Sequence, residues 1–156
     1  MRVTATDGDD DVLQLLRTNA AANARAEAVT EAPDAATSST CSAAGPVSVQ
    51  SLIWGEPPCA ARALGLAAAP DLLIATGCVY ASDEGVWTAL VHTLVQLSGP
   101  HTLVLLVHGN GAAPGAQHLR GRFYELARKH FECARVAPHH LHAQHQGCTV
   151  ACLVRR

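Results

Sequence analysis

Residues 71–107 read DLLIATGCVYASDEGVWTALVHTLVQLSGPHTLVLLV, and they contain the strongest structural signals in the chain. The runs at 71–75 and 102–107 are continuously apolar, which is typical of strands buried on both faces of a sheet. Between them, apolar residues recur at helical spacing over 86–97, until Ser98-Gly99-Pro100 ends the pattern. A strand, a helix and a strand in this order predict an α/β sheet with parallel strands.

The same alternation continues on both sides of this segment. Upstream, strands are expected at 3–6 and 47–53, with a helix between them that begins after the acids Asp9–Asp11 and continues through Ala26. Residues 29–46 are rich in Ala, Ser, Thr and Pro and are expected to form a flexible insertion.

Downstream, a helix is expected at 117–129, and two strands at 131–136 and 147–154 close the chain as an antiparallel hairpin. The whole pattern predicts a single α/β domain over residues 1–156, with a mostly parallel sheet and an antiparallel hairpin at its C-terminal edge.

Composition narrows the class of protein. The chain has 156 residues, 49% of them hydrophobic and 15% charged, which suits one domain with a real core. No apolar stretch approaches the ~20 residues of a membrane span, and the acidic N-terminus has no secretory h-region. A net charge of −2 with 4% aromatic residues argues against nucleic-acid binding. We expect a soluble cytoplasmic protein whose six cysteines are free thiols.

Six stretches of the sequence together resemble the seven-β-strand S-adenosylmethionine-dependent methyltransferases, and in particular their protein-lysine methyltransferase branch. VTATD at 3–7 is followed by LLRTNAAANA at 15–24, and SLIWG at 51–55 is similar to the family's L-x-W-G. DLLIATGCVY at 71–80 resembles D-L-I-L-x-A-D-V-V-Y, and TLVLLV followed by GRFYELARKHFECARV resembles the family's fifth strand and the helix and strand after it. The resemblance implies a Rossmann-like fold, S-adenosylmethionine as cofactor and a protein lysine as substrate.

Four residues carry the site that this resemblance implies. Ligands of open α/β sheets bind beyond the carboxyl ends of the strands. Asp7 would accept hydrogen bonds from the ribose hydroxyls, Trp54 would pack on the adenine, and Thr76 would form the floor of the crevice. Tyr80 would line the substrate-amine channel. The alternatives are a turn or cap role for Asp7, a core role for Trp54 and a half-buried rim position for Tyr80.

Two departures from the family pattern favour a second hypothesis. The glycine-rich E-x-G-x-G-x-x-G and its strand would precede residue 1, so we expect an N-terminally incomplete sheet without its central strand. The later glycine-rich stretch GNGAAPG at 109–115 follows the strand that ends at Val107, which is not the position of the family's glycine-rich motif. A partner or a longer parent chain could supply the missing strand. The family's acid before the tyrosine is replaced by Gly77, so the alternative is a non-catalytic methyltransferase-fold remnant that acts as an interaction module.

Other chemistry-bearing residues form looser groups. His139, His140, His142 and His145 share one loop, which could bind a metal loosely but is more typical of a solvated connection, and no metal site is assigned. Cys78 follows a predicted strand end and is the one thiol worth testing. A helix face bears several bases, expected to be solvated or to dock an acidic partner: Arg120, Arg122, Arg128 and Lys129.

Overall fold

A computed structural model of the chain describes residues 2–30, 47–56, 61–79, 83–109 and 116–156, and for 25–30 and 116–119 it describes the backbone alone. The chain separates into two compact units, Met1–Ile53 and Trp54–Arg156. Each unit is described below by itself. The expectation of a single domain over the whole chain stays a prediction.

The first unit holds two parallel strands and one helix. β1 (Val3–Asp7) pairs with β2 (Val47–Ser51), and α1 (Asp10–Thr30) connects them in sequence. Asp9 caps the helix, because its Oδ1 accepts hydrogen bonds from the backbone N–H groups of Asp11 (2.9 Å) and Val12 (3.1 Å). The helix continues beyond Ala26 to Thr30, so the first two residues of the expected insertion are helical, and residues 31–46 lie outside the described part.

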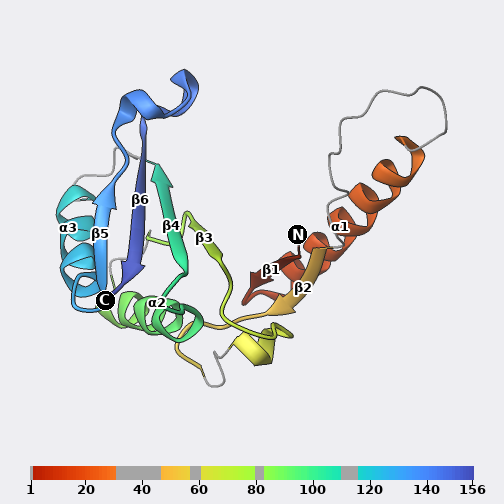
Figure 1. Cartoon of the computed structure of the whole chain (residues 1–156), viewed down its shortest axis with the longest axis horizontal. Helices are drawn as coiled ribbons and strands as arrows, with labels where there is room; N and C mark the ends of the chain where they lie inside the picture. Colours follow the sequence, from red (N-terminus) through yellow and green to blue (C-terminus); the bar gives the residue numbers. More distant parts are fainter. Residues whose placement is uncertain (1, 31–46, 57–60, 80–82, 110–115) are drawn as a thin grey trace. The chain divides into compact units, whose positions relative to one another are not determined.

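The second unit is built on a four-stranded sheet in the order β3-β4-β6-β5 (Figure 1). β3 (Leu72–Thr76) is parallel to β4 (Leu103–Gly109). β6 (Cys148–Arg155) is antiparallel both to β4 and to β5 (Phe131–Arg135). The expected C-terminal antiparallel hairpin is therefore confirmed, and β6 inserts between β5 and β4.

Two helices cover one face of this sheet. α2 (Glu84–Leu97) and α3 (Ala116–Ala127) contact each other and meet the strands in one apolar cluster (Figure 1). Every second residue of β4 and β6 faces the cluster, as the period of a strand requires. The fully buried members are large and come from all of these elements: Leu90, Val104, Leu106, Phe123, Phe131 and Leu153.

The opposite face of the sheet corrects one expectation. The run at 71–75 predicted a strand buried on both sides, but Leu72 and Ile74 of β3 are 46% and 65% exposed. β3 is an edge strand that pairs only with β4 among the described strands. Its neighbours Leu73 and Ala75 pack on the helix-side cluster, so burial on β3 is one-sided.

The described strands thus form two hydrogen-bonded sheets, β1-β2 and β3-β4-β6-β5, with no strand paired to β1 or β3 on their other edges. The expectation that a central strand is missing stays a prediction. Three short 3-10 turns were not predicted: Ala61–Leu64, Pro138–His140 and Ala143–His145.

Two further expectations can be compared with the described residues. Cys78, Cys133, Cys148 and Cys152 are all thiols, as predicted, and Cys41 and Cys59 lie outside the described part. Among the helices that the structure describes, none has the length and apolarity needed to cross a membrane.

Candidate functional site

Asp7 ends β1, at the carboxyl edge of the parallel pair. Its Oδ1 accepts a hydrogen bond from the backbone N–H of Asp9 at 3.0 Å, and its carbonyl accepts one from Leu52 N at 2.9 Å. The side chain is half-buried. Asp7 therefore does form the turn that the simpler alternative proposed, yet within the described residues its Oδ2 has no protein donor. One carboxylate oxygen is left for a ligand.

Trp54 belongs to the second unit, where it is half-buried and packs against the apolar cluster. The next residue, Gly55, has φ +83° and donates its N–H to Thr93 Oγ1 of α2 at 2.9 Å. A Cβ on Gly55 would lie 2.9 Å from the Ala89 Cβ, so only glycine fits this close approach to the helix. Trp54 packs against the apolar cluster, which agrees with the core role considered as its alternative. The residue is only partly buried, so a ligand contact with its side chain stays a prediction.

Thr76 is the last residue of β3, and its side chain is exposed at the carboxyl end of the strand. Gly77 follows with φ +68° and donates its N–H to the Val107 carbonyl at 2.9 Å. Cys78 turns back, with its Sγ 3.4 Å from the Thr76 carbonyl. Tyr80, the expected amine-channel residue, lies outside the described residues.

The expected site residues are thus placed by two separate units. Thr76 and Trp54 belong to residues 54–156 and Asp7 to residues 1–53. Asp7 and Thr76 both stand at the carboxyl ends of parallel strands, β1 and β3. Their proposed roles toward a cofactor stay predictions.

Sequence reasoning missed a cavity in the second unit. Its volume is about 480 Å³, and its walls come from three strands and the side of α3. The lining side chains are mostly polar or basic: His108, Arg120, Tyr124, Arg128, Cys133, Arg135 and Thr149, together with Gly121, Ala134 and Ala151. The spacing of Arg120, Tyr124 and Arg128, four residues apart on the helix expected at 117–129, was the available signal.

His108 lies at the bottom of this cavity, on the C-terminal part of β4, and is only 6% exposed. Its Nε2 and the Tyr124 hydroxyl are hydrogen-bonded at 3.0 Å. Burial is the largest cause that lowers the pKa of His108, and the charges of Arg120 and Arg135 lower it further, although the nearby Gly109 backbone acts in the opposite direction. The imidazole is therefore neutral at neutral pH.

Burial also raises the pKa of two neighbours in the same walls, Tyr124 and Cys133. The phenol and the thiol consequently stay protonated near neutral pH, and the thiol is a poor nucleophile. Apart from the neutral His108 ring, the charged and titratable groups of the cavity are guanidinium cations and protonated hydroxyl or thiol groups.

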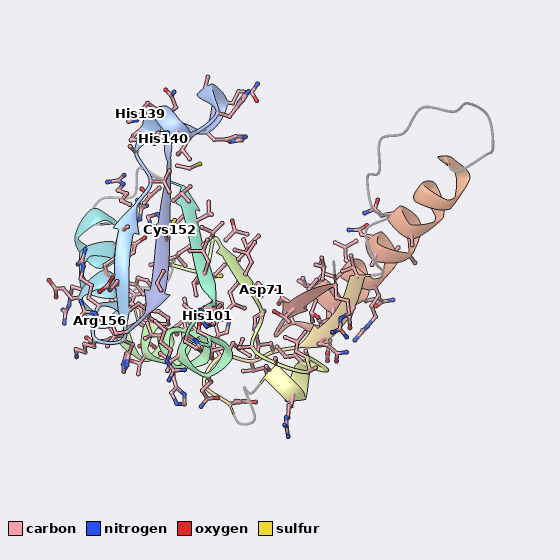
Figure 2. The ribbon with its side chains drawn as sticks, viewed as in Figure 1. Asp71, His101, His139, His140, Cys152 and Arg156 are labelled. Carbon is pink, nitrogen blue, oxygen red and sulfur yellow. The ribbon has the colours of Figure 1, made fainter. Side chains whose placement is uncertain are left out.

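The histidine loop shows ring contacts but no ligand set. His139 and His140 have ring centroids 4.1 Å apart, and Figure 2 shows both beyond the strand end, in the connection between β5 and β6. His142 and His145 lie 6.0 Å apart. In the described part of the chain, no three His, Cys, Asp or Glu side chains gather as metal ligands.

Comparison with known proteins places the fold. No family model matches this chain, and no curated protein does. Among solved structures, the PH0226 protein from Pyrococcus horikoshii OT3 aligns with a TM-score of 0.60 at 9% identity, over 100% of this chain and 72% of that one. The N-methyltransferase NodS from Bradyrhizobium japonicum WM9, in complex with S-adenosyl-L-homocysteine, aligns with a TM-score of 0.51 at 12% identity. The chain has a Rossmann-like methyltransferase fold.

The alignment to NodS covers 99% of this chain and 66% of that chain, so a third of NodS has no counterpart here. The parallel pairing and the C-terminal antiparallel hairpin expected from the sequence are both present in this fold. At these identities the likeness concerns the fold alone.

Proposed function

We propose that this protein is an S-adenosylmethionine-dependent methyltransferase that acts on amines, of the protein-lysine type. The observation that carries the proposal is the position of Asp7, a half-buried carboxylate at the carboxyl end of β1 with one oxygen not bonded to the protein. In open α/β folds the ligand lies beyond that edge. The likeness to NodS, whose structure holds S-adenosyl-L-homocysteine, supports the same choice of cofactor.

Each unit, taken by itself, presents groups of the kind that such a cofactor binds. Asp7 Oδ2 would accept a hydrogen bond from a ribose hydroxyl, and the half-exposed Trp54 ring offers an apolar surface for a purine. Thr76 would contribute a hydroxyl at the end of β3. S-adenosylmethionine, when bound, supplies an electrophilic methyl group on a sulfonium.

Methyl transfer to a lysine amine requires mainly that the protein position the two reactants. A lysine amine must lose its proton, after which the nitrogen forms a bond to the methyl carbon while the carbon–sulfur bond breaks. Orientation of the two reactants and exclusion of water can supply most of the rate acceleration in such a transfer. Tyr80 is our proposed residue along the amine path, and a protein with an accessible lysine is the proposed partner.

A methyl-transfer assay tests the proposal. Full-length protein is incubated with S-adenosylmethionine labelled in its methyl group and with a pool of lysine-containing proteins. We expect label in lysine side chains, with less label for Tyr80→Phe and for Asp7→Asn than for Asp10→Asn. Asp10 is an exposed acid at the start of α1 and serves as the matched control. Equal transfer by all variants would contradict the assigned roles.

One observation favours the non-catalytic alternative. Gly77 stands where the resembling family has an acid, and space around it is open, since a Cβ there would meet no atom within 4 Å. The backbone at Gly77 has φ +68°, a conformation that favours glycine over an acidic side chain. If the chain binds S-adenosylmethionine but labels no lysine, the interaction-module hypothesis is favoured over the enzyme.

A further inference from the structure

The basic residues of α3 and of the turn after it fall into two groups. Arg120 and Tyr124 of α3, with Arg128 just after the helix, line the cavity. Arg122, on another side of the same helix, pairs with Glu84 of α2 at 3.1 Å. Only the first group points toward the strands, where Arg135 lines the facing wall.

The three cavity guanidiniums have no anionic partner in the described part of the chain. Arg135 Nη2 donates to the Thr149 hydroxyl at 2.9 Å, and Arg128 lies 5.9 Å from the centre of the Tyr124 ring. Within the described residues the one salt bridge is that of Arg122 with Glu84, and the cavity lining contains no Asp or Glu. Three like charges around one cavity repel each other, and an anion among them relieves that repulsion.

His108 adds an independent observation. The ring lines the cavity. Its Nδ1 is buried, and no described atom lies within hydrogen-bonding distance and angle of it. When the Tyr124 hydroxyl donates to Nε2, the neutral ring carries its proton on Nδ1. A buried donor of this kind is unfavourable unless it finds an acceptor, and the backbone at Gly109 is the nearest group that acts on the ring in that way.

We propose that this cavity binds the phosphate group of a small phosphate ester. A dianionic phosphate offers enough acceptor oxygens for the guanidiniums of Arg120, Arg128 and Arg135. His108, a neutral ring, lines the same cavity. The volume of about 480 Å³ falls within the range of about 300–1,000 Å³ typical of small-molecule sites, so it holds more than the phosphate alone.

The lining favours a small ester over a nucleic acid. Single-stranded nucleic acids need a basic groove with several aromatic platforms, whereas Tyr124 is the one aromatic ring among the lining residues besides His108. A net charge of −2 for the chain also opposes long polyanions. Asp7, Trp54 and Thr76 do not line this cavity, so the proposal stands independently of the methyl transfer proposed above.

Calorimetric titration of the full chain at constant ionic strength tests the site, with phenyl phosphate, inorganic phosphate and acetate as probes. We expect saturable binding of one phenyl phosphate, weaker binding of inorganic phosphate and the weakest binding of acetate. Arg120→Gln and Arg128→Gln should each weaken the binding of phenyl phosphate and inorganic phosphate roughly tenfold, because each removes a charge-assisted hydrogen bond. Arg122→Gln, the matched control on the same helix, should bind like the unmodified protein.

Imidazole nitrogen resonances give a second readout that does not depend on affinity. Phenyl phosphate should shift the His108 signals and leave those of the exposed His92 unchanged. The absence of saturable binding at about 10 mM probe would overturn the proposed site. Equal weakening of binding by Arg122→Gln would also overturn it, because a non-specific effect of surface charge would give that result. Tighter binding of a phosphoserine peptide or an oligonucleotide than of phenyl phosphate would overturn the assignment to a small ester.

Discussion

His108 is a histidine in surroundings that oppose its charge. The residue is 6% exposed, and the charges of Arg120 of α3 and Arg135 of β5 act on the ring, while its Nε2 is hydrogen-bonded to the Tyr124 hydroxyl. Burial and these cations lower the pKa of His108 below its usual value of about 6.5. The folded state therefore resists a proton that the unfolded chain accepts.

This difference predicts a pH dependence of stability. Below about pH 6.5 the unfolded state binds more protons than the folded state, so the free energy of unfolding falls as the pH falls toward the folded pKa, and the contribution is fully present above about pH 6.5. His108→Gln removes this group and should lose less stability between about pH 7.5 and about pH 5 than the unmodified protein does. Urea unfolding midpoints at the two pH values measure the difference.

His92→Gln is the control for that experiment, because His92 is exposed on α2 and pairs with Gln96 at 3.0 Å. It should keep the pH dependence of the unmodified protein. An unchanged pH dependence in His108→Gln would contradict the assigned pKa direction.

Two threonines of α2 show how one element fixes a neighbouring loop. Thr88 and Thr93 both donate to the carbonyl four residues earlier, at 2.8 and 2.9 Å. Only Thr93 is buried and also accepts a hydrogen bond from Gly55 N. Thr93 therefore ties the Trp54-Gly55 turn to α2.

Thr93→Val should destabilise the protein by about 1–2 kcal/mol, since it keeps the shape but leaves the Gly55 N–H without its acceptor. Thr88→Val, exposed on the same helix, should change the free energy of unfolding by less than about 0.5 kcal/mol. Chemical denaturation of both variants provides the comparison. Equal effects at the two positions would show that the Gly55 hydrogen bond contributes nothing.

Gly77 and Gly121 predict opposite effects of the same substitution. Gly77 has φ +68° at the end of β3, where an added Cβ is strained, so Gly77→Ala should cost about 1–2 kcal/mol. Gly121 lies inside α3 with no atom within 4 Å of an added Cβ, so Gly121→Ala should stabilise by about 0.5–1 kcal/mol. Thermal unfolding measures both signs, and a stabilising Gly77→Ala would contradict the backbone conformation.

The elements themselves could be predicted from the sequence, and the cavity could not. The expected strand at 131–136 and helix at 86–97 differ from β5 and α2 by at most two residues at each end, because their periodicity and stop signals are local. The apolar run at 71–75 wrongly predicted burial on both faces of the strand, because an apolar run does not show whether other elements pack on each face. Arg135 and Thr149 come together because of the way β5 pairs with β6. This register cannot be read from a local sequence pattern.

At the scale of the whole molecule, the two units differ in how much apolar surface they bury. Among the buried hydrophobic residues that the structure describes, Leu13 is the one from residues 1–53, whereas the rest belong to residues 54–156. The cluster around β4 and β6 is therefore the most stable part of the described chain.

Native-state hydrogen exchange should reveal this difference. We expect the amides of β4 and β6 to exchange only through global unfolding, and those of β1 and β2 to exchange faster through local opening. Comparable protection in the two sheets would contradict the uneven division of the core.

The binding of S-adenosylmethionine to the full chain is the most direct test of the methyltransferase assignment. Isothermal titration should show one saturable site, which Asp7→Asn weakens roughly tenfold to a hundredfold through loss of a charged acceptor, while Asp10→Asn leaves it unchanged. Absence of binding at about 1 mM S-adenosylmethionine, a concentration that detects affinities as weak as about −4 kcal/mol, would contradict the assignment.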